Sequence, residues 1–275
     1  MDIKGPKYAN NHGYLLPFDI PCDRFDSALE FHPKSNTILI CTYPKCGTTW
    51  MQNIVYLLRH DGEPFSSHLN VDDEIPHLEF KGSTHCENYV VVKTHLPLNL
   101  LHWNEQAKYI IVARNPKDCC ASFFHHTRGF VKHYDYAHGT FDDYFQRFLN
   151  GQVDGGDYFD YFASWQSRLN DRNVFFCTYE QLICDTKEIV KRLALFLEIK
   201  IDDNILEKVL HHSSFQSMKK DLHRWSSERP KDMPEFIRRG EIGDWRNHFN
   251  EEQSKLIDMK VEQFPLMKTL WAKYM

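Results

Sequence analysis

Four short runs of the sequence are almost continuously apolar and rich in β-branched and aromatic residues. A strand with one face in water alternates apolar and polar residues, whereas a strand covered on both faces is apolar throughout. The runs therefore predict a parallel β-sheet that is buried between helices. They are Thr37–Tyr43, Tyr89–His95, Lys108–Arg114 and Asn173–Tyr179.

Segments with apolar residues at helical spacing separate and follow these runs. Strands that alternate with helices predict an α/β fold, with ligands bound at the carboxyl ends of the strands. The length of 275 residues suits one large domain, so we expect a single domain over residues 1–275. We expect Gly151–Asp157 to be a loop and Lys219–Gly243 to be a functional flap. The predicted helices are Thr48–Arg59, Pro116–Arg128, Phe141–Leu149, Tyr158–Leu169, Lys187–Glu198 and Glu251–Phe264.

The composition argues against several classes of protein. A net charge of −5 disfavours nucleic-acid binding, which usually requires a basic surface. No stretch reaches the roughly 20 apolar residues of a membrane span, and the polar start of the chain does not resemble a signal peptide. The 8 cysteines show no paired CxxC spacing, so we expect free thiols, no zinc and a cytoplasmic protein.

The turn after the first apolar run has the composition of an anion site. Pro44-Lys45-Cys46-Gly47-Thr48-Thr49-Trp50 joins this strand to a helix. Free N–H groups at a helix N-terminus attract anions, Lys45 adds a full charge, and Gly47 allows close approach of the backbone. Thr48 or Thr49 as a simple helix cap is the alternative interpretation. The complete pattern favours a P-loop-like phosphate-binding strand-turn-helix.

The expected strand ends argue against a magnesium-dependent nucleotide triphosphatase. Such enzymes place a carboxylate near the phosphate turn to hold the metal. Here the second run ends in Lys93-Thr94-His95 and the third in Arg114, without an Asp. The pattern predicts a metal-free site that neutralises charge. A nucleotide-dependent small-molecule kinase and a non-catalytic nucleotide-binding module remain the alternatives.

An ordered series of motifs resembles the cytosolic sulfotransferase family. The series spans most of the chain and comprises TYPKCGTTW at 42–50, KTHLP at 93–97, RNPKDCCAS at 114–122, TYE at 178–180, SSFQSMK at 213–219 and FIRRGEIGDW at 236–245. This resemblance implies a donor, 3′-phosphoadenosine-5′-phosphosulfate (PAPS), whose product is the desulfated nucleotide PAP. It also implies a small hydroxylated acceptor and no metal.

The resemblance assigns roles to the matching positions. It implies Lys45, Lys93, His95 and Ser122 as catalytic residues, with His95 as the base. It implies a 5′-phosphosulfate site at Lys45, Cys46, Gly47, Thr48 and Thr49, and an adenine site at Trp50, Tyr179, Ser213 and Phe215. It implies a 3′-phosphate site at Arg114, Ser122, Arg238, Arg239 and Gly240.

Residue chemistry supports these roles independently. The arginine fork matches phosphate oxygens, and a neutral imidazole is suited to removing a hydroxyl proton at neutral pH. Lys93, two residues before His95 on the same strand face, is expected to keep that imidazole uncharged. Lys45 is expected to neutralise charge that grows on the oxygen bridging sulfur and phosphorus.

The acceptor site is less defined by the sequence. The family's phenols, catecholamines or other monoamines, and hydroxysteroids are the expected acceptors. Asp72, Asp73 and Glu74 could favour a cationic phenol such as dopamine or octopamine, although an exposed acidic loop is the simpler and favoured interpretation. Besides His95, the candidate contacts are Phe18, Phe80, Phe123, Phe130, Tyr144 and Phe236.

Three positions depart from the family pattern. Cys46 replaces a serine, and function is expected to survive if this position uses its backbone N–H, but a thiol beside Lys45 could be sensitive to oxidation. Ser213 replaces a threonine and keeps the hydroxyl. The family's late dimerisation segment corresponds to Arg246–Lys255, where the final charge is reversed. We therefore expect either a monomer or a homodimer, without assuming the family's dimer.

Overall fold

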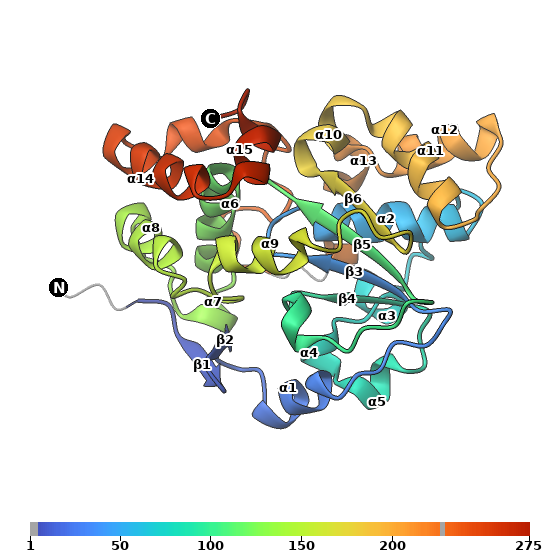
Figure 1. Ribbon diagram of the computed structural model, residues 1–275, viewed down its shortest axis with the longest axis horizontal. Coiled ribbons are helices and arrows are strands. Elements are labelled where there is room, and N and C mark those ends of the chain that lie inside the picture. The colour runs from blue at the N-terminus through green and yellow to red at the C-terminus, as the bar shows by residue number, and fades with distance from the viewer. Residues whose placement is uncertain (1–4, 226–228) are drawn as a thin grey trace.

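A computed structural model describes residues 5–225 and 229–275 of the chain. Its centre is a parallel sheet with strand order β4-β3-β5-β6 (Figure 1). The predicted parallel sheet is confirmed, since each apolar run contains one strand. These strands are β3 (Ile38–Thr42), β4 (Val91–Thr94), β5 (Lys108–Ala113) and β6 (Val174–Thr178).

Both faces of this sheet are buried, which explains why the strands are apolar throughout. Successive side chains of a strand point to opposite faces. On β3, Leu39 and Cys41 belong to one hydrophobic core, whereas Ile38 and Ile40 belong to the other. All four side chains are buried. A polar residue at any of these positions would lie in a core rather than in water.

Helices cover the two faces (Figure 1). One core includes side chains of α2 (Thr48–Arg59), α11 (Thr186–Phe196) and α12 (Asp203–His212). The other includes side chains of α6 (Pro116–Gly129), α8 (Phe141–Leu149), α9 (Tyr158–Gln166), α14 (Glu251–Glu262) and α15 (Pro265–Trp271). All six predicted helices are present, and α2 and α8 have the predicted ends.

The N-terminal hairpin was not predicted, because its strands are short and partly polar. β1 (Tyr8–Asn11) pairs antiparallel with β2 (Tyr14–Pro17). The two linking residues, His12 and Gly13, have φ of 54° and 88°, as a tight hairpin turn of the primed type requires. Tyr14 of β2 donates its hydroxyl hydrogen to the His95 carbonyl, so the hairpin contacts the end of β4.

The ten-residue helix α12 was not predicted. Like α15, the remaining helices of three to eight residues were also absent from the prediction, because such short segments give little periodicity. They are α1 (Cys22–Leu29), α3 (Val71–Glu74), α4 (Leu78–Lys81), α5 (Ser83–Cys86), α7 (Val131–Tyr134), α10 (Tyr179–Cys184), α13 (Phe215–Lys220) and the 3₁₀ turns η1 (Leu98–Leu100), η2 (Leu222–Trp225) and η3 (Asp244–Asn247).

The two predicted irregular regions differ. The loop over 151–157 contains neither helix nor strand, as expected. The predicted flap begins inside α13 and continues through η2, whereas residues 229–243 have no regular structure. Its residues 226–228 lie outside the described part of the chain. None of the helices in the described ranges is long and apolar enough to cross a bilayer.

All eight cysteines are free thiols. Six of them are buried, and Cys22 and Cys184 are exposed. The expectation of free, mostly buried thiols is therefore confirmed.

Candidate active site

A cavity of about 570 Å³ lies at the carboxyl ends of the parallel strands. Lys45 follows β3, and His95 follows β4. Arg114 follows β5, and Tyr179 follows β6. Since parallel strands end at the same edge of a sheet, residues far apart in the sequence meet in one cavity. The sheet thus brings together the predicted phosphate turn, the predicted base and a predicted phosphate-binding arginine.

The predicted phosphate turn has a strained backbone that opens a helix toward the cavity. Lys45 has a φ of 67° and Gly47 a φ of 100°, both in the left-handed region. α2 begins at Thr48, and its N-cap residue Gly47 supplies no side-chain hydrogen bond. The Thr48 hydroxyl instead lies 2.6 Å from the hydroxyl of Thr42. The simple threonine cap is therefore excluded, and the first N–H groups of α2 remain available to an anion.

Cys46 does not line the cavity, in contrast to the prediction. Its N–H donates to the Tyr43 carbonyl at 3.2 Å, and its sulfur lies 3.8 Å from that of Cys119. Burial raises the pKa of the Cys46 thiol well above its ordinary value. A buried, protonated thiol is a poor nucleophile, so the expected sensitivity to oxidation does not follow.

Two cations at the turn, the half-buried Lys45 and the buried Arg114, lack an acidic partner among the described residues. Lys45 Nζ lies 4.2 Å from the ring centre of Phe236, and the guanidinium of Arg114 lies 4.1 Å from that of Tyr179. Arg114 also donates to the Lys45 carbonyl at 3.1 Å. Burial, then Arg229 and Arg114, lowers the pKa of Lys45 well below its ordinary value. An anion bound between these cations would relieve that penalty.

The predicted pair Arg238 and Arg239 lies at the same end of the cavity, held by a carboxylate that the sequence did not reveal. Asp244, which is 3% exposed, accepts from Arg238 and pairs with Arg239 at 2.9 Å. Burial opposes ionisation of Asp244, but the hydrogen bond from Arg238 lowers its pKa to about 2. The arginines are therefore positioned before any ligand arrives.

A second unpredicted carboxylate anchors this segment to α6. Asp118 accepts from the N–H of Gly243 at 2.7 Å and from that of Trp245 at 2.9 Å. Asp118 is buried and belongs to the helix that follows Arg114. It therefore fixes the segment that carries Arg238 relative to the strand end that carries Arg114.

The remaining predicted nucleotide contacts also line the cavity. The Arg114 Nε and the Ser213 hydroxyl are buried without a partner in the described protein, and phosphate or sugar oxygens would satisfy both. Trp50 and Tyr179 pack edge to face with ring centres 5.8 Å apart. These contacts are Gly47, Thr48, Thr49, Trp50, Ser122, Tyr179, Ser213, Phe215 and Gly240.

Gly240 supports the same interpretation, because its place cannot take a side chain. Its φ is 66°, and an added Cβ would lie 2.5 Å from the Phe215 ring. A flat adenine beside Phe215 and Tyr179 fits such a narrow, aromatic space. The residues present therefore fit an adenosine nucleotide with two anionic groups.

His95 is held in a single tautomer by the backbone. Its Nδ1 lies 2.6 Å from the Thr42 carbonyl, which only accepts, so Nδ1 carries the proton and Nε2 is free to accept one. The backbone N–H of His95 donates to the Glu79 carboxylate at 2.5 Å, and its backbone carbonyl accepts from the Tyr14 hydroxyl at 2.9 Å. Burial, followed by His77, lowers the pKa of His95 to about 3. His95 is therefore neutral, and its unprotonated Nε2 can accept a proton.

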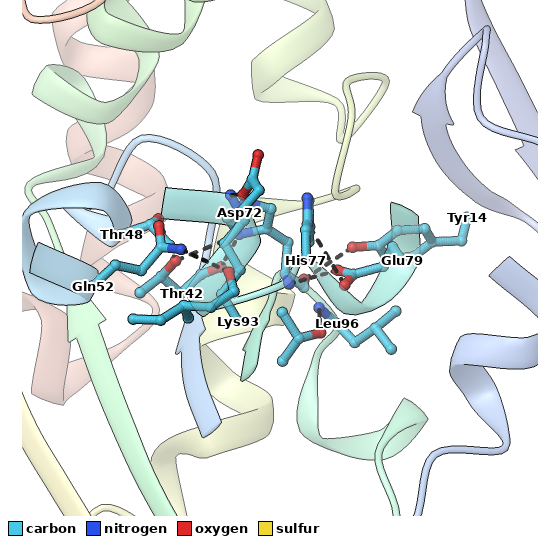
Figure 2. Close-up of polar contacts among 12 residues, drawn as sticks. Tyr14, Thr42, Thr48, Gln52, Asp72, His77, Glu79, Lys93 and Leu96 are labelled. Atoms are coloured by element: carbon cyan, nitrogen blue, oxygen red, sulfur yellow. Dashed lines mark hydrogen bonds and ion pairs between the residues drawn. The ribbon is translucent and has the colours of Figure 1, made fainter. Parts of the chain in front are cut away.

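Lys93 contributes less to this neutrality than the sequence suggested. It ranks behind burial and His77 among the influences that lower the His95 pKa. Its ammonium pairs instead with Asp72 at 3.2 Å (Figure 2). The predicted electrostatic role of Lys93 toward His95 is therefore minor, although Lys93 lines the cavity.

His77 and Glu79 form a pair beside His95 that the sequence did not reveal (Figure 2). His77 Nε2 lies 3.4 Å from the Glu79 carboxylate, and the His77 ring packs against His95 at 4.9 Å. Glu79 is 1% exposed, and although burial opposes ionisation, His77 and His95 lower its pKa to about 2. Isolated polar residues on short helices gave no periodic signal from which to predict this pair.

Only part of the predicted acceptor pocket is present. Phe80, Phe130 and Phe236 line the cavity together with His95. Phe18, Phe123 and Tyr144 do not line it, so their assignment to the acceptor site is corrected. Phe18 is 43% exposed, whereas Phe123 and Tyr144 are fully buried and pack on each other in the core. An aromatic residue in an amphipathic helix is as compatible with a core as with a pocket, so spacing could not separate them.

The acidic segment 72–74 is largely occupied by protein contacts. Asp72 lines the cavity but pairs with Lys93. Asp73 accepts from the Asn70 N–H at 2.9 Å as part of the capping box of α3. Glu74 does not line the cavity. A histidine and a carboxylate missed by the sequence, His126 and Asp154, do line it.

One cluster among the described residues has side chains close enough to share a metal ion. It consists of the exposed residues Glu30, His32 and His102. None of the three lines the cavity. The cluster is therefore separate from the candidate active site.

Together, these features define an α/β group-transfer enzyme that binds an anionic donor at its strand ends. A family model described as the sulfotransferase domain matches residues 35–270. The chain is 30% identical to sulfotransferase 1B1 of Canis lupus familiaris, covering 90% of this chain and 89% of that protein. It is 31% identical to human sulfotransferase 1E1, covering 94% and 92%. The chain belongs to the sulfotransferase family.

A solved structure agrees at the level of the fold. The mouse sulfotransferase SULT7A1, complexed with PAP, superimposes with a TM-score of 0.78 at 22% identity, over 97% of this chain and 98% of that one. Family membership identifies the protein as a sulfotransferase enzyme. The kinase and the non-catalytic module are therefore set aside.

Proposed function

We propose that this enzyme transfers the sulfuryl group of PAPS to a hydroxyl group of a small acceptor, with His95 as the base. The main observation behind this proposal is that a neutral His95 with an unprotonated Nε2 lines the same cavity as Lys45 and Arg114. Neither cation forms an ion pair with an acid of the described residues. The acceptors are expected among phenols, monoamines and hydroxysteroids. The PAP bound to the mouse sulfotransferase supports PAPS as the donor here.

The residues proposed to bind the nucleotide are assigned from the positions of two cations, Lys45 and Arg114. Lys45 and the N–H groups of the α2 turn suit the 5′-phosphosulfate, and Arg114 suits a permanent 3′-phosphate. The aromatic rings and the unpaired Ser213 hydroxyl suit the adenosine between them. The proposed set is Lys45, Gly47, Thr48, Thr49, Trp50, Arg114, Ser122, Tyr179, Ser213, Phe215, Arg238, Arg239 and Gly240.

PAPS supplies an activated sulfuryl group. His95 Nε2 accepts the proton of the acceptor hydroxyl while the new oxygen–sulfur bond forms and the bond from sulfur to the bridging oxygen breaks. Lys45 neutralises the charge left on that bridging oxygen. Lys93, held by Asp72, lies near the transferring group. The reaction leaves PAP, a sulfated acceptor and a proton that returns to solvent from His95.

The direct test is incubation with labelled PAPS and a panel of phenols, monoamines and steroids in the presence of a metal chelator. We expect a labelled organic sulfate and one equivalent of PAP. A protein that turned over no hydroxylated acceptor in the panel, or that required a divalent metal, would contradict the proposal. The product list also identifies the acceptor class.

A further inference from the structure

The acceptor end of the cavity contains one buried carboxylate with no cation beside it. Asp154 is 9% exposed and lines the cavity. Its Oδ2 accepts from the Tyr134 hydroxyl at 2.7 Å, and no Lys, Arg or His of the described ranges forms an ion pair with it. Burial raises the pKa of Asp154 to about 7. A buried carboxylate costs several kcal/mol unless a cation accompanies it.

The hairpin strand β2 connects Asp154 to the catalytic base. The hydroxyl of Tyr14 donates to the His95 carbonyl at 2.9 Å. The next residue, Leu15, accepts from the N–H of Gly155 at 3.1 Å. Tyr14 and Leu15, which are successive residues of β2, therefore hydrogen-bond to the segment of His95 and to the turn that contains Asp154. His95 and Asp154 both line the cavity, so an acceptor has a base and a carboxylate available in one space.

The other acids that line the cavity already have partners or are exposed. Asp72 pairs with Lys93, and Asp244 pairs with Arg238. Glu241 is exposed to solvent. Asp154 therefore differs from the rest in being buried and without a cation.

The cations near the acceptor end do not compensate Asp154. His133 lines the cavity but lies 2.7 Å from Asp19. Arg24 donates to the Lys81 carbonyl at 3.5 Å. Lys45 and Arg114 lie at the phosphate turn. Arg229 lies 4.2 Å from the centre of the Phe130 ring, and it donates to the Pro234 carbonyl at 2.6 Å. Among the described residues, none of these cations forms an ion pair with Asp154.

We propose that Asp154 binds the ammonium group of a cationic, amine-bearing phenol whose hydroxyl is presented to His95. This inference rests on the proposed function and specifies its acceptor class. Phe80 and Phe130 supply the aromatic walls for the ring between the two polar ends. The Tyr134 hydroxyl orients the carboxylate by donating to Oδ2, which leaves Oδ1 for the ligand.

The experiment compares a matched pair of acceptors, tyramine and 4-ethylphenol, which differ in the amine. The measured quantity is kcat/KM for each acceptor with wild type, Asp154→Asn and Glu74→Gln. Glu74→Gln is the control, because it also removes one negative charge but lies outside the cavity. Glu74 belongs to the acidic segment 72–74, which the sequence analysis considered for binding a cationic phenol. We expect wild type and Glu74→Gln to prefer tyramine by at least about tenfold, and Asp154→Asn to lose this preference with 4-ethylphenol unaffected.

Equal use of the two acceptors by wild type, or equal losses for both in Asp154→Asn, would overturn the inference. An unchanged affinity for PAP in Asp154→Asn confirms that the variant folds. If neither phenol is sulfated, the proposed function fails separately. Calorimetry then measures the binding of tyramine and 4-ethylphenol to the PAP complex. Tighter binding of tyramine by wild type, lost in Asp154→Asn, would support the inference. Equal binding of the two phenols by wild type would refute it.

Discussion

The nucleotide end and the acceptor end of the cavity are built in different ways. The nucleotide end consists of strand ends and a helix N-terminus, and its cations Lys45 and Arg114 have no acidic partner in the described protein. The acceptor end consists of side chains from a hairpin, short helices and a loop, and its carboxylate Asp154 forms no ion pair with a cation of the described residues. The backbone thus defines the donor, whereas individual side chains define the acceptor.

This difference explains how one fold can keep its donor while changing its acceptor. The donor site depends on the order of strands and on the turn after β3, which are properties of the whole sheet. The acceptor site depends on residues such as Phe80, Phe130 and Asp154, which can change without altering the sheet. Substitutions at the two ends should therefore separate donor effects from acceptor effects.

The largest expected effect is that of His95→Ala, which tests whether the base is independent of the nucleotide end. Loss of the proton acceptor should reduce kcat by about 10²–10⁴-fold. The Kd for PAP should change by less than about twofold, because His95 contacts Thr42 and Glu79 rather than the proposed nucleotide residues. Single-turnover kinetics and calorimetry measure the two quantities. His68→Ala, at an exposed position, is the control, and near-normal turnover of His95→Ala would remove His95 as the base.

The next effect is that of Lys45→Met, which removes a charge from the nucleotide end and keeps an apolar side chain against Phe236. Loss of this cation should lower kcat by about 10²–10³-fold, because the bridging oxygen loses its neutralising group. The relative preference between acceptors should remain. Steady-state rates with two acceptors provide the measurement, and Lys200→Met, on the surface, is the control. A change in acceptor preference would show that the two ends are not separate.

Acid titration of stability tests Glu79, the buried carboxylate that contacts His77 and His95. Glu79 has a pKa near 2 in the folded protein, against an ordinary value of 4.5. A lowered pKa stabilises the fold above the ordinary value, and this contribution disappears as the pH falls toward the folded value. Between about pH 5 and about pH 3, wild type should therefore lose on the order of 2 kcal/mol more free energy of unfolding than Glu79→Gln. Urea denaturation at each pH measures the free energy of unfolding of both proteins. If wild type and Glu79→Gln lost the same free energy of unfolding on acidification, Glu79 would not have this role.

The smallest effect is that of Ser213→Ala. Its hydroxyl is buried without a protein partner, so removal should not destabilise the fold. If the hydroxyl binds the nucleotide, the Kd for PAP should rise by roughly two- to tenfold. Asp154→Asn, at the opposite end, should leave that Kd unchanged. An identical PAP affinity in Ser213→Ala would remove Ser213 from the donor site.

The same difference between the ends decided what could be predicted from the sequence. The strands, six of the seven described helices of nine or more residues and the phosphate turn were predicted, because continuous apolar runs and helical spacing report burial directly. The ten-residue helix α12 was missed. The motifs at Lys45, His95 and Arg114 lie at strand ends, and parallel strands necessarily bring their ends together.

The acceptor end could not be predicted in this way. Phe123 and Tyr144 are core residues with the same spacing as cavity residues. Asp154 and His77 come from a loop and a short segment, whose placement depends on tertiary contacts such as the bond between Leu15 and Gly155. The burial of Cys46 was likewise hidden, because it depends on packing against Cys119.

The most direct test of the account is calorimetric titration of the purified protein with PAP and with adenosine 5′-monophosphate, in the presence of a metal chelator. The two ligands differ only in the 3′-phosphate that Arg114 is proposed to bind. We expect PAP to bind at least about tenfold more tightly, since a charge-assisted hydrogen bond contributes roughly 1.5–3 kcal/mol. Equal affinities, or no binding of PAP, would contradict the claim that the cations at the strand ends converge on a doubly anionic adenosine nucleotide.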